Sequence, residues 1–232
     1  MRFQELDWRE TPLGELSLRR RSDPVLGQDV YEVKLGDEFL MSSAFTVAEE
    51  TMARLALGRV PGTALDVAVG GLGLGYTAQA VLADQRVRSL VVVEALPEVV
   101  EWHARGLVPA AVREDSRCRV VHGDFFALVG SPAADGLDRF HAIVVDIDHS
   151  PRHLLHPSHA GFYEVAGLRR LAGHLHPGGV FALWSNDPPD EPFTAVLAEV
   201  FAEVAAEVVS FPNPLQDREA ANTVYLARSR EE

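Results

Sequence analysis

The chain has few of the residues on which several classes of protein depend. It contains one cysteine, Cys118, among 232 residues, which excludes an internal disulfide and a zinc site built from several thiolates. No apolar run approaches the ~20 residues of a membrane-spanning helix, so we expect no membrane segment. The first seven residues include Glu5 and Asp7, whereas a secretory signal has an apolar stretch there. We therefore expect a cytoplasmic protein.

Positive charge is also scarce. Lysine and arginine total 21 against 34 aspartates and glutamates, which gives a formal net charge of −13. Such a surface repels the phosphate backbones of nucleic acids, so we expect no nucleic-acid partner. A cationic or neutral small molecule is compatible with this charge, although negative charge also serves solubility alone.

The remaining composition is that of a globular domain. Hydrophobic residues make up 47% of the chain and charged residues 24%, which suffices for a sizeable core. The early part is strand-like, and Gly36-Asp37 between two apolar runs predicts a hairpin. We predict a small N-terminal β-strand region over residues 1–45 and one larger domain over residues 46–232.

Apolar strands and helices alternate in the larger domain. Thr46 and Glu49 fit a capping box at the start of its first helix. The patterns predict strands at 64–69, 90–93, 120–121, 142–145 and 180–184, and helices at 97–105, 158–175 and 191–206. This alternation is typical of a parallel sheet covered on both faces. Two last strands, 208–211 and 223–227, predict a terminal hairpin with an antiparallel edge.

A glycine-rich segment follows the first strand of this unit and opens a helix. It contains Gly70, Gly71, Gly73 and Gly75. Glycine lets the backbone approach a ligand, and the amides of a helix N-terminus favour negative charge. Glu94 ends the next strand, where a carboxylate accepts hydrogen bonds from ribose hydroxyls. Together they indicate a nucleoside-containing cofactor; the structural alternatives are a tight turn and a simple strand end.

The spacing of the glycines bears on which cofactor this is. The NAD fingerprint needs the register Gly73, Gly75 and Ala78, which leaves three residues between the strand end and the first glycine. The spacing Gly71-x-Gly73-x-Gly75 fits the loop of S-adenosylmethionine-binding enzymes better.

Further motifs extend this pattern along the chain. They are Val92-Val93-Glu94, His122-Gly123-Asp124, Asp146 after the fourth strand, Phe162-Tyr163-Glu164, and Leu175-His176-Pro177-Gly178-Gly179. From about residue 30 onward the chain resembles the class I S-adenosylmethionine-dependent methyltransferase fold, and within it the spermidine synthase-like branch. The resemblance implies an α/β, Rossmann-like sheet that is parallel with an antiparallel C-terminal strand, plus a small N-terminal β extension. It also implies a homodimer.

The resemblance implies roles for the residues at the strand ends. Glu94 would bind the ribose, and Asp124 would accept from the adenine amino group with Phe125 or its neighbours against the ring. Asp146 would face the reacting sulfonium or the substrate amine. These positions agree with physical expectation, because ligands of open α/β sheets bind beyond the carboxyl ends of the strands. Asp124 is equally suited to cap the short helix that follows it.

Two motifs depart from the spermidine synthase pattern. That branch carries Asp-[Ser/Thr]-[Ser/Thr]-Asp-Pro after the fourth strand, whereas this chain has Asp146-Ile147-Asp148, with the second acid two positions on. The branch's Tyr-His-Glu is matched here by Ala48-Glu49-Glu50. Both departures weigh against recognition of a diamine or other polyamine by the means of that branch.

Candidate catalytic and acceptor-binding residues follow from these motifs. Asp146 or Asp148 would orient an amine and accept its proton, with a capping aspartate as the alternative for Asp148. The candidate substrate-binding residues are Glu50, Tyr76, His149 and Trp184. Trp184 is alternatively a core residue.

Four histidines lie in the segment after the fourth strand. They are His149, His153, His156 and His159. Their spacing matches no metal motif, so we predict no metal site. The segment is either a loop that closes over the substrate, with one histidine as general base, or a plain surface loop.

These observations predict an S-adenosylmethionine-dependent transferase that acts on a small molecule, most simply a methyltransferase. Two alternatives stay open. One is aminopropyl transfer from decarboxylated S-adenosylmethionine; the other is a non-catalytic nucleoside-binding module.

Overall fold

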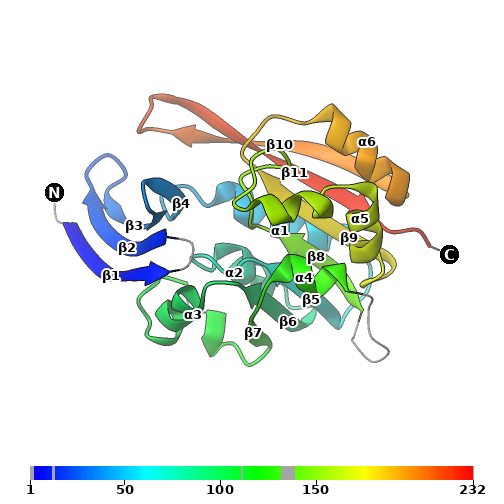
Figure 1. Ribbon diagram of the computed structural model, residues 1–232, viewed down its shortest axis with the longest axis horizontal. Helices are drawn as coiled ribbons and strands as arrows, with labels where there is room; N and C mark the ends of the chain where they lie inside the picture. Colours follow the sequence, from blue (N-terminus) through cyan, green and yellow to red (C-terminus); the bar gives the residue numbers. More distant parts are fainter. Residues whose placement is uncertain (1–2, 12–13, 111, 132–138, 232) are drawn as a thin grey trace.

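The strands of the protein form two sheets (Figure 1). A computed structural model describes residues 3–11, 14–110, 112–131 and 139–231. One sheet is antiparallel, in the order β1-β2-β3-β4, and the other has seven strands in the order β10-β11-β9-β8-β5-β6-β7. The smaller sheet lies at one end of the long axis and the C-terminus at the other (Figure 1).

The bounds of the elements follow the predicted alternation. The smaller sheet consists of β1 (Phe3–Thr11), β2 (Gly14–Asp23), β3 (Gln28–Leu35) and β4 (Glu38–Ser42). The larger sheet consists of β5 (Leu65–Gly70), β6 (Val87–Glu94), β7 (Cys118–His122), β8 (Phe140–Val145), β9 (Leu175–Ser185), β10 (Glu203–Asn213) and β11 (Arg218–Arg228). The helices are α1 (Val47–Gly58), α2 (Tyr76–Ala83), α3 (Pro97–Ala104), α4 (Phe125–Gly130), α5 (Val165–Ala172) and α6 (Glu191–Val200), with 3₁₀ turns η1 (Val112–Glu114) and η2 (Pro157–Phe162).

The pairing of the larger sheet confirms the predicted fold class. Strands β5 to β9 pair in parallel, while β11 pairs antiparallel with both β9 and β10. The C-terminal hairpin therefore supplies the antiparallel edge. No helix in the described ranges is long and apolar enough to cross a membrane.

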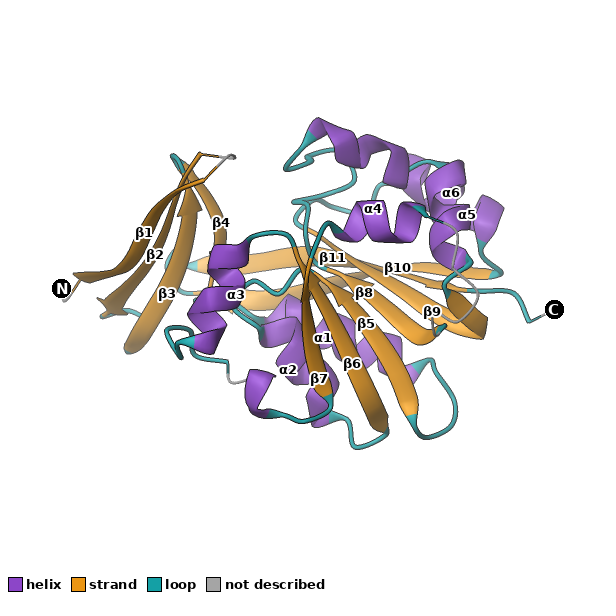
Figure 2. Cartoon of the chain, turned by 60° about the horizontal axis from the view of Figure 1, so that its bottom comes forward, coloured by secondary structure: helices purple, strands orange, loops and turns teal. Residues whose placement is uncertain are grey.

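Helices cover both faces of the larger sheet (Figure 2). Apolar side chains of α1, α2 and α3 form one core with one face, and side chains of α4, α5 and α6 form a second core with the other. The central strands β5 and β8 are buried on both sides, which is why their sequences are nearly continuous apolar runs.

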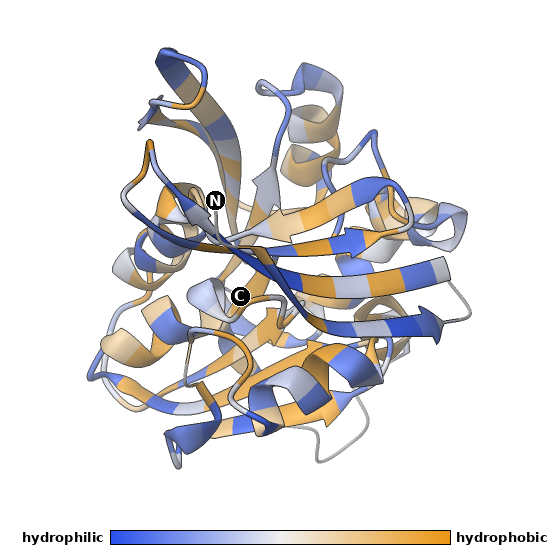
Figure 3. Ribbon diagram, turned by 90° about the vertical axis from the view of Figure 1, so that its left-hand side faces the viewer, coloured by the Kyte–Doolittle hydropathy of each residue, from blue (hydrophilic) through white to orange (hydrophobic). Residues whose placement is uncertain are grey.

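The N-terminal sheet packs against the first of these cores. The hairpin predicted at Gly36-Asp37 joins β3 to β4. Leu16, Leu18 and Val33 of this sheet are fully buried and belong to the α1–α3 core. Its strands mix hydrophilic and hydrophobic residues (Figure 3), as expected for a sheet with one covered face.

Three polar contacts fix the N-terminal sheet beside the larger domain. The indole Nε1 of Trp102 donates to Asp7 Oδ2 at 2.7 Å. Arg9 pairs with Glu101 at 3.0 Å. Glu38, in the β3–β4 hairpin, bonds with His149 at 3.1 Å. The last contact brings the hairpin to the segment that follows β8.

The predicted capping box is wrong. Thr46 is the N-cap of α1, but its side chain makes no capping bond. Its hydroxyl instead donates to Glu50 Oε1 at 2.8 Å. The hydroxyl is thus engaged one position beyond the expected partner, Glu49.

Two predicted helices are too long. The range 158–175 contains a 3₁₀ turn, a short α5 and the first residue of β9, because hydrogen bonds from this segment to buried Asp148 hold η2 in place of regular helix. The range 191–206 ends as helix at Val200. From Glu203 the chain pairs with β11 along the full length of β10, and this pairing overrides helix propensity.

Gly167 provides a test of how η2 packs on α5. A Cβ there would lie 2.2 Å from the Gly161 backbone oxygen, and backbone cannot yield cheaply. Gly167→Ala should lower the free energy of unfolding by about 2–3 kcal/mol, the upper range for overpacking, as measured by urea denaturation. Gly130→Ala is the matched control, since nothing lies within 4 Å of its Cβ position. Equal stability of the two variants would contradict this packing.

Candidate active site

The predicted site residues gather at the carboxyl ends of four adjacent parallel strands. These strands are neighbours in the order β8-β5-β6-β7. Gly70 ends β5 and Glu94 ends β6. Asp146 comes directly after β8, and Asp124 comes soon after β7. This edge is where ligands bind in open α/β sheets.

The glycine loop and the end of β8 are joined backbone to backbone. The Asp146 amide donates to the Gly70 oxygen at 2.9 Å. Gly71 has φ +91°, and a Cβ there would lie 2.2 Å from the Asp146 carbonyl oxygen. Gly75 has φ +94°, and its Cβ would lie 2.8 Å from the His103 ring. Only glycine fits either position.

Gly73 lies in the same loop, but its neighbour is a flexible side chain and not backbone. Its φ is +50°, and a Cβ there would lie 3.1 Å from the sulfur of Met41, at the end of β4. The loop therefore touches the N-terminal sheet through a flexible side chain.

Glu94 holds this loop. Its Oε2 accepts from the amides of Leu72 at 2.9 Å and Gly73 at 3.4 Å, and its Oε1 accepts from Leu96 at 2.8 Å. The side chain is buried, and burial raises its pKa. The amide of Ala95 also lowers the pKa of this carboxylate, against the effect of burial. Its ribose-binding role stays a prediction.

Asp124 caps α4, which is the alternative role that the sequence predicts for it. Its Oδ1 accepts from the amides of Phe126 at 2.8 Å and Ala127 at 3.3 Å. Both bonds use Oδ1 and the residue is exposed, so Oδ2 keeps acceptor capacity. Phe125 is buried instead, with its ring 2.8 Å from where a Cβ on Gly70 would lie. The Phe125 ring therefore packs against Gly70, at the start of the glycine loop.

Asp146 and Glu49 form an acidic pair. The hydroxyl of Thr77 donates to Asp146 Oδ2 at 2.8 Å, and burial raises the pKa of Asp146. Glu49, in the first turn of α1, is half-buried. Burial, followed by repulsion from the Asp146 and Glu50 carboxylates, raises the pKa of Glu49 to about 8.

Sequence reasoning selected Glu50 in place of Glu49. The structure places Glu50 half-exposed, bonded to Thr46 and 3.6 Å from Arg54. Glu49 precedes buried Met52 and Ala53 by three and four residues, which is the spacing of one helix face. That periodicity was the signal for an inward-facing Glu49.

Tyr76 lies near Glu49, and Trp184 lies in β9. Tyr76 opens α2 and hydrogen-bonds Ser43, and burial raises its pKa while Glu49 and Glu50 add to the shift. Trp184 packs against the α1–α3 core. Its indole Nε1 is buried and has no hydrogen-bond partner among the described residues, which leaves a donor for a ligand. The binding roles of Glu50, Tyr76, His149 and Trp184 stay predictions.

Asp148 points away from Asp146. Its carboxylate is 1% exposed and accepts from the amide of Leu155, from His159 Nδ1 and from the hydroxyl of Tyr163, at 2.7 to 2.8 Å. Tyr163 belongs to the α4–α6 core, whereas the partner of Asp146 is on α2. The two acids therefore serve opposite faces of the sheet, and three donors hold Asp148 in a positioning role.

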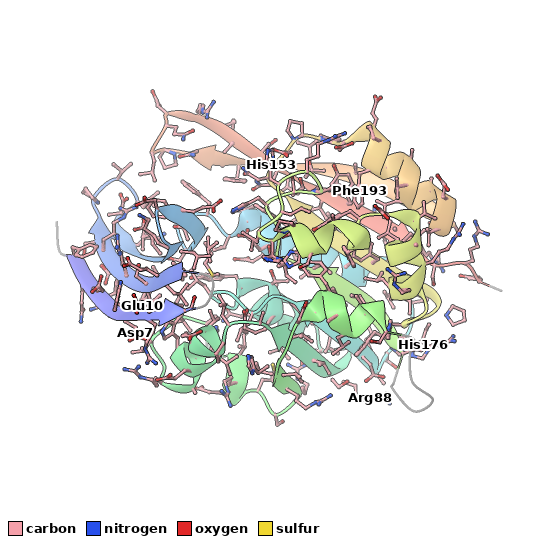
Figure 4. The ribbon with its side chains drawn as sticks, in the orientation of Figure 1. Asp7, Glu10, Arg88, His153, His176 and Phe193 are labelled. Carbon is pink, nitrogen blue, oxygen red and sulfur yellow. The ribbon has the colours of Figure 1, made fainter. Side chains whose placement is uncertain are left out.

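The four histidines of the segment after β8 have separate partners. His149 bonds with Glu38, His153 with Asp187 at 3.0 Å and His156 with Ser158 at 2.7 Å. Figure 4 shows His153 with this segment, far from His176 near the opposite end of the sheet. No three metal-ligating side chains converge within the described ranges.

The fold is that of known transferases. Two spermidine synthases each match 99% of the chain. The one from Thermotoga maritima has 15% sequence identity and a TM-score of 0.75, and the match covers 73% of its own length. The one in complex with the transition-state analogue AdoDATO has 16% identity and a TM-score of 0.76, and the match covers 75% of its own length. Human methyltransferase-like protein 13 in complex with SAH matches 81% of this chain and 82% of its own, at 20% identity and a TM-score of 0.57. No protein-family model and no curated protein matches the sequence.

These likenesses confirm the predicted fold. The chain has the class I methyltransferase-like fold in the form found in spermidine synthases, N-terminal sheet included. The structural neighbours are transferases, and they leave the choice between methyl and aminopropyl transfer undecided.

The raised pKa of Glu49 makes stability fall as pH rises. The folded chain keeps the proton up to about pH 8, while the unfolded chain loses it near its ordinary pKa of about 4.3. Folding is therefore penalised increasingly between these values. Glu49→Gln should gain about 1–3 kcal/mol over the wild type near pH 8 and little near pH 4. Urea unfolding at several pH values measures this. Glu199→Gln, at an exposed position, should leave the free energy of unfolding unchanged near both pH 4 and pH 8. A stability gain of Glu49→Gln that does not depend on pH would contradict the raised pKa of Glu49.

Proposed function

We propose that the protein transfers a carbon group from a sulfonium nucleoside of the S-adenosylmethionine type to an amine of a small molecule. The acidic pair Glu49–Asp146 carries this proposal. Burial is the main cause of the raised pKa of Glu49, and repulsion from the Asp146 carboxylate at the ligand-binding edge adds to it. An ammonium or sulfonium between them relieves that repulsion.

The residues present fit the nucleoside. The loop at Gly71 has no room for a side chain, so its backbone is free to approach a ligand closely. Asp124 binds its two amides through Oδ1 alone, so Oδ2 keeps acceptor capacity. Glu94 ends β6 and Asp124 follows β7, the next two strands after β5, at steps of about 4.8 Å per strand. A nucleoside lying across these ends would place its ribose at Glu94 and its base toward Asp124.

The chemistry divides between the ligand and the chain. When bound, the sulfonium supplies an electrophilic carbon and a neutral thioether leaving group. The attacking amine must be neutral, and it gives up a proton as its new N–C bond forms and the C–S bond breaks. Asp146, held by Thr77, is placed to orient the amine and accept that proton. Glu49 would lose its own proton when a cation enters, because a nearby positive charge lowers its pKa.

Methyl transfer is the first form of this proposal. Aminopropyl transfer is the second, and two observations favour it. The N-terminal sheet of this chain is matched in two spermidine synthases, and a second acid beside Asp146 would repel the carboxylate that S-adenosylmethionine carries and its decarboxylated form lacks. A module that binds the nucleoside without reaction would release neither product.

Paired calorimetric titrations test the nucleoside assignment. S-adenosylmethionine and its decarboxylated form differ by one carboxylate, which the acidic pair would either tolerate or repel. Tighter binding of the first supports methyl transfer, and tighter binding of the second supports aminopropyl transfer. Glu94→Gln should weaken either by about tenfold, since it exchanges an acceptor for a donor, whereas Glu199→Gln should not. Absence of binding to the wild type would refute the proposal.

Asp146→Asn tests the proton-accepting role. With a panel of small amines and polyamines, the wild type should form S-adenosylhomocysteine in methyl transfer or methylthioadenosine in aminopropyl transfer. The variant should turn over about 100-fold more slowly, the lower range for loss of a general base, with nucleoside affinity changed far less. The Asn oxygen still accepts from Thr77, so the local fold is kept. An unchanged rate would remove Asp146 from catalysis.

A further inference from the structure

A buried histidine contacts the glycine loop and is not used by the proposed chemistry. His103, in α3, is 8% exposed. Its Nε2 lies 2.9 Å from the carbonyl oxygen of Gly73. A carbonyl oxygen only accepts, so Nε2 is the donor. Burial lowers the pKa of His103, so near pH 7 the ring is neutral and carries its one proton on Nε2.

The ring meets the loop at a second point. Its Cε1 atom is 2.8 Å from where a Cβ on Gly75 would lie. Gly75 is the N-cap of α2, and its amide donates to the Leu72 oxygen at 2.8 Å. The ring of His103 therefore borders the loop from Gly73 to the start of α2.

The bond from His103 complements the bonds made by Glu94. The Glu94 carboxylate accepts from the amides of Leu72 and Gly73, whereas His103 donates to the Gly73 carbonyl. The amide and the carbonyl of Gly73 belong to two different planar peptide units. Each unit is held by a different element, one by β6 and the other by α3. Gly73 has no Cβ to restrict its backbone, so these two bonds fix its conformation.

Helix α3 is a firm support for this histidine. Trp102, the preceding residue, is fully buried, and its indole Nε1 donates to Asp7 Oδ2 at 2.7 Å. Glu101 pairs with Arg9 at 3.0 Å. A group positions its neighbours more precisely when it is itself fixed by packing and hydrogen bonds. The contacts to β1 supply that support for His103.

We propose that His103 is a positioning residue for the nucleoside: its Nε2 holds the Gly73 carbonyl, and with it the loop, in the conformation that binds the ligand. This inference rests on the proposed function, since it concerns the same nucleoside. A loop that is already formed spares the ligand the conformational entropy of ordering a glycine-rich segment. Loss of this one bond should therefore weaken nucleoside binding although His103 acts only through the loop.

Calorimetry with methylthioadenosine tests the inference. This compound is the part that both candidate donors share, so the result does not depend on which group is transferred. His103→Leu removes the N–H donor and keeps an apolar side chain, and it should weaken binding about tenfold, the value of one hydrogen bond. His103→Gln carries an N–H donor at the same remove from Cβ as Nε2, and it should bind within about threefold of the wild type.

His174→Leu is the matched control. His174 is 3% exposed, and its Nε2 bonds with the Ser131 carbonyl oxygen at 3.1 Å, so the change removes a buried bond of the same kind. His174 directly precedes β9, at the edge of the sheet opposite the candidate site. Both leucine variants should unfold at a lower temperature than the wild type, and only His103→Leu should bind the nucleoside more weakly.

A measurement on the unmodified protein reports the bond itself. In ¹⁵N spectra of the histidine side chains near pH 7, His103 should carry its proton on Nε2, with or without methylthioadenosine. A proton on Nδ1 alone would overturn the inference.

The binding outcomes distinguish this inference from the proposed function. A wild type that does not bind methylthioadenosine refutes both. Wild-type affinity in His103→Leu overturns this inference and leaves the proposed function standing. Equal weakening in His103→Leu and His103→Gln assigns the ring a space-filling role, and equal weakening in His174→Leu assigns the effect to general instability; either result overturns the inference.

Discussion

The close approach of Gly71 to the Asp146 carbonyl is the constraint on which the site depends. It joins the end of β5 to the end of β8 with no side chain between them. In the turn that follows, the amides of Leu72 and Gly73 donate to Glu94. Helix α2 begins soon after, and the hydroxyl of its Thr77 donates to the Asp146 carboxylate. This backbone contact thereby bears on the positions of Glu94 and Asp146 together.

Much of this arrangement could be predicted from local patterns. The apolar runs of the parallel strands, the hairpin at Gly36-Asp37 and the glycine loop are short-range features that the sequence displays directly. Glu49 was missed because its importance comes from Asp146, a residue distant in the chain. The break at η2 depends on bonds to Asp148, and the length of β10 depends on its pairing with β11. Local propensity contains none of these long-range terms.

Two aspartates two positions apart have different environments on opposite faces of one sheet. Asp146 has one hydrogen-bond donor, Thr77, and an acidic neighbour, so its carboxylate gains from a cation. Asp148 has three donors and gains nothing further from one. Strand alternation would place residues two positions apart on one face, but β8 ends at Val145 and the chain bends from Asp148, so the two side chains have different partners. Asp146 is thus the acid that the proposed chemistry uses, whereas Asp148 holds surrounding groups of the protein in position.

The contact between Gly73 and Met41 has a consequence for how this sequence can vary. Gly71 faces backbone, so no change elsewhere relieves a side chain placed there. Gly73 faces only a thioether, and its φ of +50° lies in the region that asparagine also adopts. A shorter residue at position 41 would make room for asparagine at 73. Position 41 is in the smaller sheet and position 73 is in the loop after β5; the two should covary among relatives, while position 71 should stay invariant.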